Sequence, residues 1–272
     1  MGEPIILTLL AETMEMVLSS FIILFSLFII ATLYSSVGHG GASGYLAVLS
    51  LTVYASQDPS WLRQYAWSLN LLVASLAFWA YSRAGFFNYK LAISFMSASI
   101  PAAIFGGLLK VDHGVYDTLL SITLVLAAWR LLVSKHESRG EIFVSPPPIH
   151  ISVIVGAVIG FLSGIIGVGG GIFLSPIILL FGWADAKTTA GIAAAFIWVN
   201  SAAGLIGNSI SGQLEIELVT LLPFAIAVVL GGLLGSRIGS TVFSHDLVRR
   251  MLVSVLVLAA LKRILDLVFT LF

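Results

Sequence analysis

Two glycine-rich stretches are the parts of this sequence best suited to bind a small anion. Clustered glycines end a helix and allow backbone conformations that other residues rarely adopt. A short apolar segment follows each stretch, so the unpaired N–H groups and the positive dipole end of a new helix would face the break. Such a helix start binds an anion without any fixed positive charge. The candidate binding residues in the two stretches are Gly38, His39, Gly40, Gly41, Ser43, Gly167, Gly169, Gly170 and Gly171.

Close helix packing is the alternative interpretation of these glycines, because small residues let membrane helices approach each other. A single glycine pair would favour packing. Here two clusters occur at matching places in the chain, and each precedes a short apolar segment. This repetition favours a binding site.

Asn70 and Asn200 lie at equivalent places in two later apolar segments. A buried amide is costly without hydrogen-bond partners. Each asparagine therefore either bonds to a neighbouring helix and fixes the packing, or donates an N–H group to a substrate anion. Trp67 and Trp198 lie nearby, and they are candidates for packing or for a gate.

His39 is the only histidine inside an apolar segment. An ionisable group inside a membrane indicates function by default, and imidazole titrates near neutral pH. His39 is therefore a candidate for substrate contact and for proton coupling. The alternative is a neutral imidazole that closes the tip of the break by hydrogen bonding.

The composition excludes most classes of protein. The chain has 272 residues, of which 59% are hydrophobic and 10% charged, and it has no cysteine. An average soluble domain has about 25% charged residues. A soluble enzyme, a nucleic-acid binder, a disordered chain and a disulfide scaffold are therefore excluded, and we expect no cofactor, no metal site and no catalytic residue.

Apolar runs predict ten helical segments. The second and seventh are too short to cross the roughly 30 Å hydrocarbon core at full helical rise. Whether they cross or fold back stays open at this stage. The segments are 17–37, 42–55, 65–82, 90–109, 115–134, 149–166, 171–182, 188–209, 217–237 and 247–271.

The chain is a duplication. Gly38 aligns with Gly167 and Asn70 with Asn200, and the spacing between all matched motifs stays between 125 and 132 residues. We therefore divide the chain into a first repeat (residues 1–138), a proline-rich linker (139–148) and a second repeat (149–272). Each repeat is a glycine-interrupted helix pair followed by three transmembrane helices.

The charge distribution predicts that the two repeats are inverted. If each interrupted pair enters and leaves on the same side, one membrane face has nine Lys and Arg residues and the other four. If each pair crosses once, the split is seven against six. The positive-inside rule favours the first arrangement, which also puts both termini outside. Inverted repeats around a midplane site are common in secondary transporters.

The second break belongs to a longer motif, residues 160–176, that resembles the signature of the sulfite exporter TauE/SafE family, and residues 189–200 resemble its following helix. The resemblance covers essentially the whole chain, since this family has two such repeats. The first repeat departs from the signature at His39, Ala42 and Ala47. The resemblance implies transport of small sulfur-containing anions, such as sulfite or organosulfonates, across a bacterial inner membrane.

These observations predict an all-α polytopic membrane protein that works as a secondary transporter by alternating access. Its expected partners are the anion, the lipid bilayer and a coupled proton or other ion, with no nucleic acid; the oligomeric state stays open. A passive anion channel is one alternative. The other is a rhomboid-like serine protease, because residues 41–44 match a Gly-x-Ser-Gly pattern around Ser43. Such a protease needs a histidine base within hydrogen-bonding distance of the serine.

Overall fold

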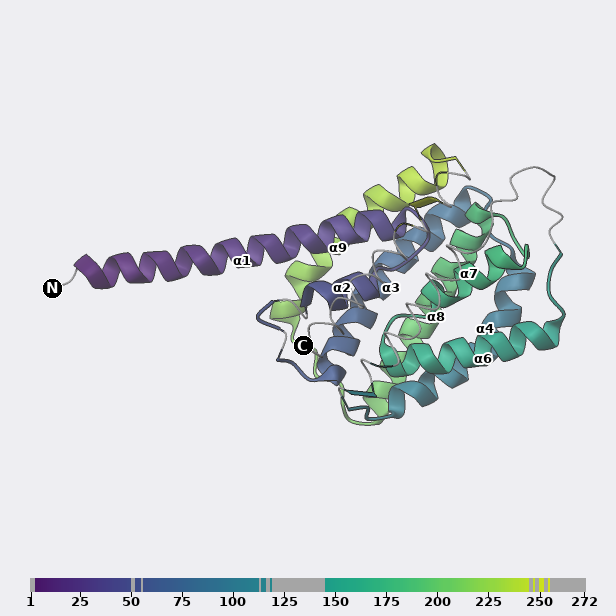
Figure 1. Cartoon of the computed structure of the whole chain (residues 1–272), viewed down its shortest axis with the longest axis horizontal. Coiled ribbons are helices and arrows are strands. Elements are labelled where there is room, and N and C mark those ends of the chain that lie inside the picture. The colour runs from purple at the N-terminus through teal and green to yellow at the C-terminus, as the bar shows by residue number, and fades with distance from the viewer. Residues whose placement is uncertain are drawn as a thin grey trace.

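The part of the chain that the computed structural model describes is mostly helical and contains no strand (Figure 1). This part comprises residues 3–49, 52–54, 56–112, 114–115, 118, 145–244, 247, 250–251 and 254. The predicted all-α class is confirmed. The helices are α1 (Glu3–Ser35), α2 (Ala42–Leu49), α3 (Pro59–Arg83), α4 (Tyr89–Leu108), α6 (Ile149–Ile166), α7 (Gly171–Leu180), α8 (Ala186–Ile210) and α9 (Leu218–Arg237), followed by the π-helical turn η1 (Ile238–Val242).

Five described segments are long and apolar enough to cross a membrane, as the composition predicts. α3 is as long as α8 but less apolar overall, and it has buried polar side chains at Arg63, Gln64 and Asn70. It packs against α8, α9, α2 and α1 in the interior. The five segments are Val17–Ser35, Tyr89–Leu108, Ile149–Ile166, Ala186–Ile210 and Leu218–Val242.

The described helices overlap eight of the predicted segments, but α1 begins at Glu3 and α3 at Pro59, well before the predicted residues 17 and 65. α2 ends earlier than predicted, at Leu49, and α7 ends at Leu180. Predicted segments 115–134 and 247–271 lie largely outside the described residues, as does the linker before residue 145.

α4 and α6 pack side by side along three glycines of α6, four residues apart (Figure 1). A Cβ atom on any of them would lie 2.1–2.3 Å from a backbone carbonyl oxygen of α4. The two helices are therefore parallel, with their backbones in direct contact. The pairs are Gly156 with Phe95, Gly160 with Ser99, and Gly164 with Ala103.

The same type of contact joins α9 to α1. Three glycines at the end of α9 and in η1 lie against carbonyl oxygens of α1 and of the residue after it, again in parallel. In Figure 1, α1 extends to the left, well beyond the other labelled helices. The pairs are Gly231 with Phe28, Gly235 with Thr32, and Gly239 with Ser36.

The central helices α3 and α8 are antiparallel. Successive contacts pair later residues of α3 with earlier residues of α8, from one end of the bundle to the other. The contacts are Ser60 with Asn208, Trp67 with Gly204, Asn70 with Ser201, and Tyr81 with Gly191.

Contacts of α9 and α4, the fourth helices of the two repeats, show in which direction these two helices run. α9 is parallel to α3, because Phe224 contacts Tyr65 and Gly232 contacts Val73. α4 is parallel to α8 in the same way, through pairs of Ser99 with Asn200 and Gly107 with Gly204. Consequently α1, α3 and α9 run one way, and α6, α8 and α4 run the other. Helices that the repeat alignment matches therefore run in opposite directions.

The two ends of the bundle are named here by a lysine. The Lys110 end holds the starts of α3 and α9 and the end of α4. The Lys187 end holds the starts of α4, α6 and α8. Both short helices fold back toward the end where their preceding long helix began. Tyr54, after α2, stacks on Trp61 at the Lys110 end, and Trp183, after α7, packs on Phe95 at the Lys187 end.

Candidate functional site

The two glycine-rich breaks meet in the middle of the bundle, beside Asn70. A Cβ atom on Gly40 of the first break would lie 2.2 Å from Asn70 Oδ1. A Cβ atom on Gly169 of the second break would lie 2.8 Å from Asn70 Nδ2. Both positions also contact the Ile197 side chain of α8. The structure thus brings together residues from both predicted half-sites.

Asn70 is fully buried and bonds to both breaks. Its Oδ1 accepts a hydrogen bond from the N–H of Ala42, the first residue of α2, at 3.0 Å. Its Nδ2 donates to Val168 O at 3.4 Å and to Ser201 Oγ at 3.5 Å. This single amide therefore caps α2 and holds the second break, which favours the positioning role over direct contact with an anion.

Asn200 is also fully buried, but it is oriented differently. Its Nδ2 donates to Phe196 O at 2.8 Å and to Ser99 Oγ at 3.2 Å. Phe196 O can only accept, so the nitrogen of the amide must face it. Asn200 Oδ1 is left without a hydrogen-bond partner among the described residues. The amide N–H groups that were expected to meet a substrate are used within the protein.

His39 connects the first break to the second short helix. Its ring is 2% exposed, and Nδ1 lies 3.0 Å from Val37 O while Nε2 lies 3.4 Å from Ser175 Oγ in α7. Because a carbonyl only accepts, Nδ1 carries the proton of a neutral ring, and Nε2 accepts from Ser175. His39 is thus the ionisable side chain that joins the two repeats at the centre.

Each break also packs on the third helix of the other repeat, and glycine is required at both contacts. Gly38 has φ 75°, and a Cβ atom there would lie 2.1 Å from Ala190 O in α8. Gly167 has φ 91°, and its Cβ would lie 2.9 Å from Cγ of Arg63 in α3. Other residues are strained at such φ values and would not fit.

Backbone donors remain available where the breaks meet. Among the described residues, the N–H groups of Gly40, Gly41, Gly169 and Gly170 have no hydrogen-bond acceptor. α2 and α7 both begin next to these glycines, so their positive dipole ends face the same region from opposite ends of the bundle. This arrangement can bind an anion through backbone groups alone.

Ser43 lies one residue inside α2, and its hydroxyl pairs with Tyr34 Oη at 3.0 Å. His39, four residues before Ser43 in the sequence, pairs with Ser175 instead. The described geometry therefore contains no Ser43–His39 hydrogen bond of the kind that a serine protease needs.

The two candidate gate residues lie in different environments. Trp67 is fully buried, and Gly204 of α8 packs against its ring. Trp198 is 44% exposed. The two tryptophans therefore do not form a symmetric pair around the centre.

Arg63 is a buried cation, although the charge distribution along the chain counts it among the four basic residues of one membrane face. It is 1% exposed and donates to Ile165 O at 3.1 Å and to Leu109 O at 3.3 Å, and its guanidinium lies 5.6 Å from the Trp67 ring centroid. A signal was available in the sequence, because residues 63, 67 and 70 have the i, i+4, i+7 spacing of one helix face.

Lys187 is the second such cation, at the opposite end of the bundle. It is 7% exposed, and Nζ donates to Ser240 O at 3.2 Å beyond the end of α9. Nζ also lies 4.8 Å from the Phe86 ring centroid. A helix C-terminus and an aromatic face both stabilise a cation.

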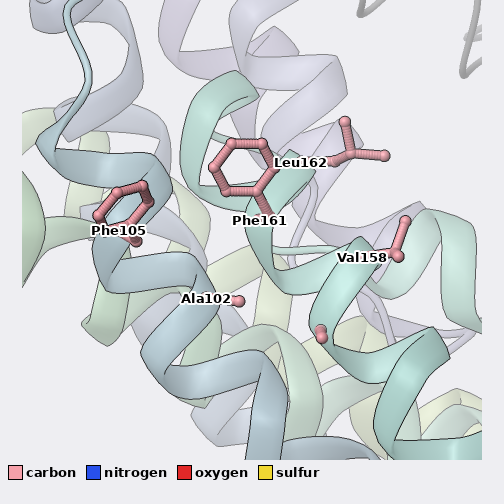
Figure 2. A pocket seen from close by; sticks show the side chains of 6 residues that line it. Ala102, Phe105, Val158, Phe161 and Leu162 are labelled. Atoms are coloured by element: carbon pink, nitrogen blue, oxygen red, sulfur yellow. The ribbon is translucent and has the colours of Figure 1, made fainter.

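A pocket on the outside of the bundle is not part of this site. It lies between α4 and α6 and is lined by apolar side chains, among them Phe105, Val158 and Phe161 (Figure 2). Phe105 and Val158 are largely exposed, as expected of side chains that face lipid. The pocket has no polar group in its lining that could bind an anion.

Sequence comparisons point to a single family. The family described as Sulfite exporter TauE/SafE matches residues 23–263. The chain is 35% identical over 238 residues to the probable membrane transporter protein y4hK of Sinorhizobium fredii, which covers 86% of this chain and 94% of that protein. It is 26% identical over 252 residues to the probable membrane transporter protein YunE of Bacillus subtilis, covering 82% and 88%. No solved structure matches the chain significantly.

Proposed function

Because the chain belongs to the sulfite exporter TauE/SafE family, and is thus a multi-pass membrane transporter and not an enzyme, we propose that it carries small sulfur-containing anions by alternating access. The substrate class is sulfite, an organosulfonate or a related oxyanion. The observation that carries this proposal is the meeting of two helix starts and four unbonded backbone N–H groups beside Asn70.

An oxyanion at this place would accept hydrogen bonds from Gly40, Gly41, Gly169 and Gly170. Two helix dipoles would add attraction from opposite sides. Asn70 would keep the breaks in position, and Asn200 would hold α8 against α4 through Ser99. Binding through backbone groups alone leaves the empty site uncharged, so the site is less costly to keep inside a membrane.

The distribution of charge supports an inverted topology with the Lys187 end in the cytoplasm. This end has four basic residues at helix ends, whereas the Lys110 end is rich in carboxylates. The positive-inside rule then orients the chain in a bacterial inner membrane. The residues are Arg83, Lys90, Lys187 and Arg237 at the first end, and Asp58, Asp112, Glu215 and Glu217 beside Arg63 and Lys110 at the second.

His39 would couple a proton to the anion. A proton added at Nε2 would turn this atom from an acceptor into a donor, and the ring would then bear a positive charge next to the anion site. The interaction with Ser175 would rearrange at the same step, so protonation and the position of α7 would depend on each other.

Flux in proteoliposomes tests the proposal. The purified chain is reconstituted, and uptake and efflux of sulfite, an organosulfonate, sulfate and a carboxylate are measured with and without a pH gradient. We expect saturable flux of at least one sulfur anion, accelerated by the gradient. Flux of every sulfur anion at the rate of empty-liposome leakage would refute the substrate class. Flux without saturation or gradient dependence would support the passive channel instead.

A further inference from the structure

Four aromatic rings form one cluster at the Lys110 end of the bundle, named here the Tyr54 cluster. Tyr54 follows α2 and stacks on Trp61 of α3, with ring centroids 5.3 Å apart. Trp61 stacks in turn on Tyr65 at 3.9 Å. Phe224 of α9 closes the cluster with edge contacts to Tyr54 at 5.6 Å and to Tyr65 at 6.5 Å.

Three rings form a second cluster at the Lys187 end, named here the Trp183 cluster. Trp183 follows α7 and stacks on Phe95 of α4, with centroids 5.8 Å apart. Phe181 also stacks on Trp183, with ring centroids 5.1 Å apart. Phe95 is fully buried and Trp183 is 9% exposed, so this contact excludes solvent.

The repeat alignment relates the two clusters to each other. Phe95 and Phe224 lie in the matched helices α4 and α9, about one helical turn from strict alignment, and Tyr54 and Trp183 are 129 positions apart. Gly38 and Gly167 of the breaks have the same separation. In both clusters, the segment after a short helix of one repeat contacts the fourth helix of the other repeat. The duplication has thus placed one aromatic contact of the same design at each end of the bundle.

We propose that the Tyr54 and Trp183 clusters are the two gates of the transport cycle, one for each side of the membrane. The proposal rests on the alternating-access function proposed above. Each cluster fixes the far end of a short helix whose near end lies at the anion site. Separation of Tyr54 from Phe224 would release α2 and admit water from the Lys110 end. Separation of Trp183 from Phe95 would release α7 and admit water from the Lys187 end.

The polar contacts nearby support this assignment. At the Lys110 end, Gln64 Oε1 accepts from Glu215 N at 2.6 Å, and Tyr65 Oη exchanges hydrogen bonds with the backbone of Glu217. These bonds join the start of α3 to the loop before α9. They would form and break together with the contacts of the Tyr54 cluster. Trp67 and Trp198, by contrast, lie within the long helices α3 and α8 and not in the segments that follow α2 and α7.

The absence of cysteine from the sequence provides the test, because one introduced thiol reports water access to the centre. Ser201→Cys places this thiol beside Asn70 and Gly169, where the native hydroxyl is fully buried. A charged, membrane-impermeant methanethiosulfonate is added from one side of oriented vesicles at a time, without substrate. Loss of one aromatic pair would shift the equilibrium between the closed and the open gate by about 2- to 12-fold.

We expect Phe224→Ala to accelerate labelling about tenfold from the Lys110 side only, and Phe95→Ala to do so from the Lys187 side only. Equal acceleration from both sides, or none from either, would overturn the proposal. Phe78→Ala is the matched control. It removes another edge-to-face pair, with Phe87 at 5.0 Å, that lies in neither cluster, and it should leave both rates unchanged.

Two further measurements keep the test decisive. Phe224→Leu retains most of the volume, so it should fold normally and still give one-sided acceleration if Phe224→Ala fails to fold. Labelling does not depend on which anion is carried, so a wrong substrate class would leave the one-sided pattern intact. Sulfur-anion flux with two-sided labelling would retain the transport function and reject only the gates.

Discussion

The two halves of the molecule share a scaffold but not a polar centre. Asn70 bonds to both breaks, whereas Asn200, its counterpart, bonds to its own helix and to Ser99. Likewise the first break contains His39 where the second has Val168. The duplication therefore supplied helix breaks, close-packed glycines and aromatic contacts twice. The hydrogen bonds at the centre depend on single residues of one repeat.

The largest effect is expected where the shared scaffold is tightest. Gly38→Ala should prevent most of the molecules from folding, because the added Cβ would lie 2.1 Å from Ala190 O at φ 75°. Gly85→Ala is the matched control, with φ 84° and no atom within 4 Å of its Cβ. It should cost about 1 kcal/mol from backbone strain alone. Yield of monodisperse protein and thermal midpoint measure both, and equal losses would contradict the packing argument.

The next effect separates the two asparagines. Asn70→Ala should lower flux more than tenfold and destabilise the protein by about 1–3 kcal/mol, because Ala42 N and Val168 O lose their partner. Asn200→Ala removes only the contacts to Ser99 and Phe196, so its loss of flux should be several-fold smaller. Flux per folded transporter and thermal midpoint are the measurements. Equal losses from both variants would mean that the asparagines act as a symmetric pair.

The third prediction concerns the histidine that the second repeat lacks. His39→Gln keeps a polar side chain but cannot take up a proton near neutral pH, so anion exchange should continue while acceleration by a pH gradient disappears. Ser175→Ala is the comparison variant, because it removes the hydroxyl at Nε2 but leaves the titratable imidazole, so acceleration by the gradient should persist at an altered rate. Gradient-driven flux is compared with exchange at equal pH on both sides. Gradient dependence that persists in His39→Gln would exclude this residue from coupling.

The smallest effect is expected at Trp198, and Trp67 provides the comparison. Trp198→Phe changes a half-exposed side chain, so the free energy of unfolding should move by less than about 0.5 kcal/mol. Trp67→Phe should cost about 1–3 kcal/mol, because this ring is fully buried against Gly204 and beside Arg63. Chemical unfolding in detergent measures the difference. A loss of flux in Trp198→Phe with unchanged stability would restore that residue as a gate candidate.

Local patterns predicted most of the fold. Apolar length and glycine clusters gave α6 with its observed limits and the starts of α2 and α7, because helix length and helix breaks depend on nearby residues. The charge count favoured pairs that return to the side where they entered, and this arrangement relative to a membrane remains a prediction. Segments 115–134 and 247–271 and the linker remain predictions.

The centre was harder to predict. Both asparagines and His39 were identified as candidates, but their partners come from helices far away in the sequence. That Asn70 would bond to both breaks while Asn200 turns toward Phe196 depends on small relative shifts of the two repeats. The burial of Arg63 depends likewise on where Ile165 and Leu109 end their helices. No periodicity in one segment encodes such distances.

The glycine contacts of α6 and α9 have a consequence for biogenesis. α6 meets its partner early, because Gly156 lies against Phe95, which the ribosome has already delivered to the membrane. α1 meets α2 first, where Gly44 packs on Ile30, but its backbone contact with α9 must wait until Gly231 and Gly235 have been translated. α1 is therefore inserted before α4 and α6 but is fully packed only after them. A nascent chain stopped before α9 should hold α4 and α6 together while the backbone face of α1 remains available to lipid or to quality-control proteases.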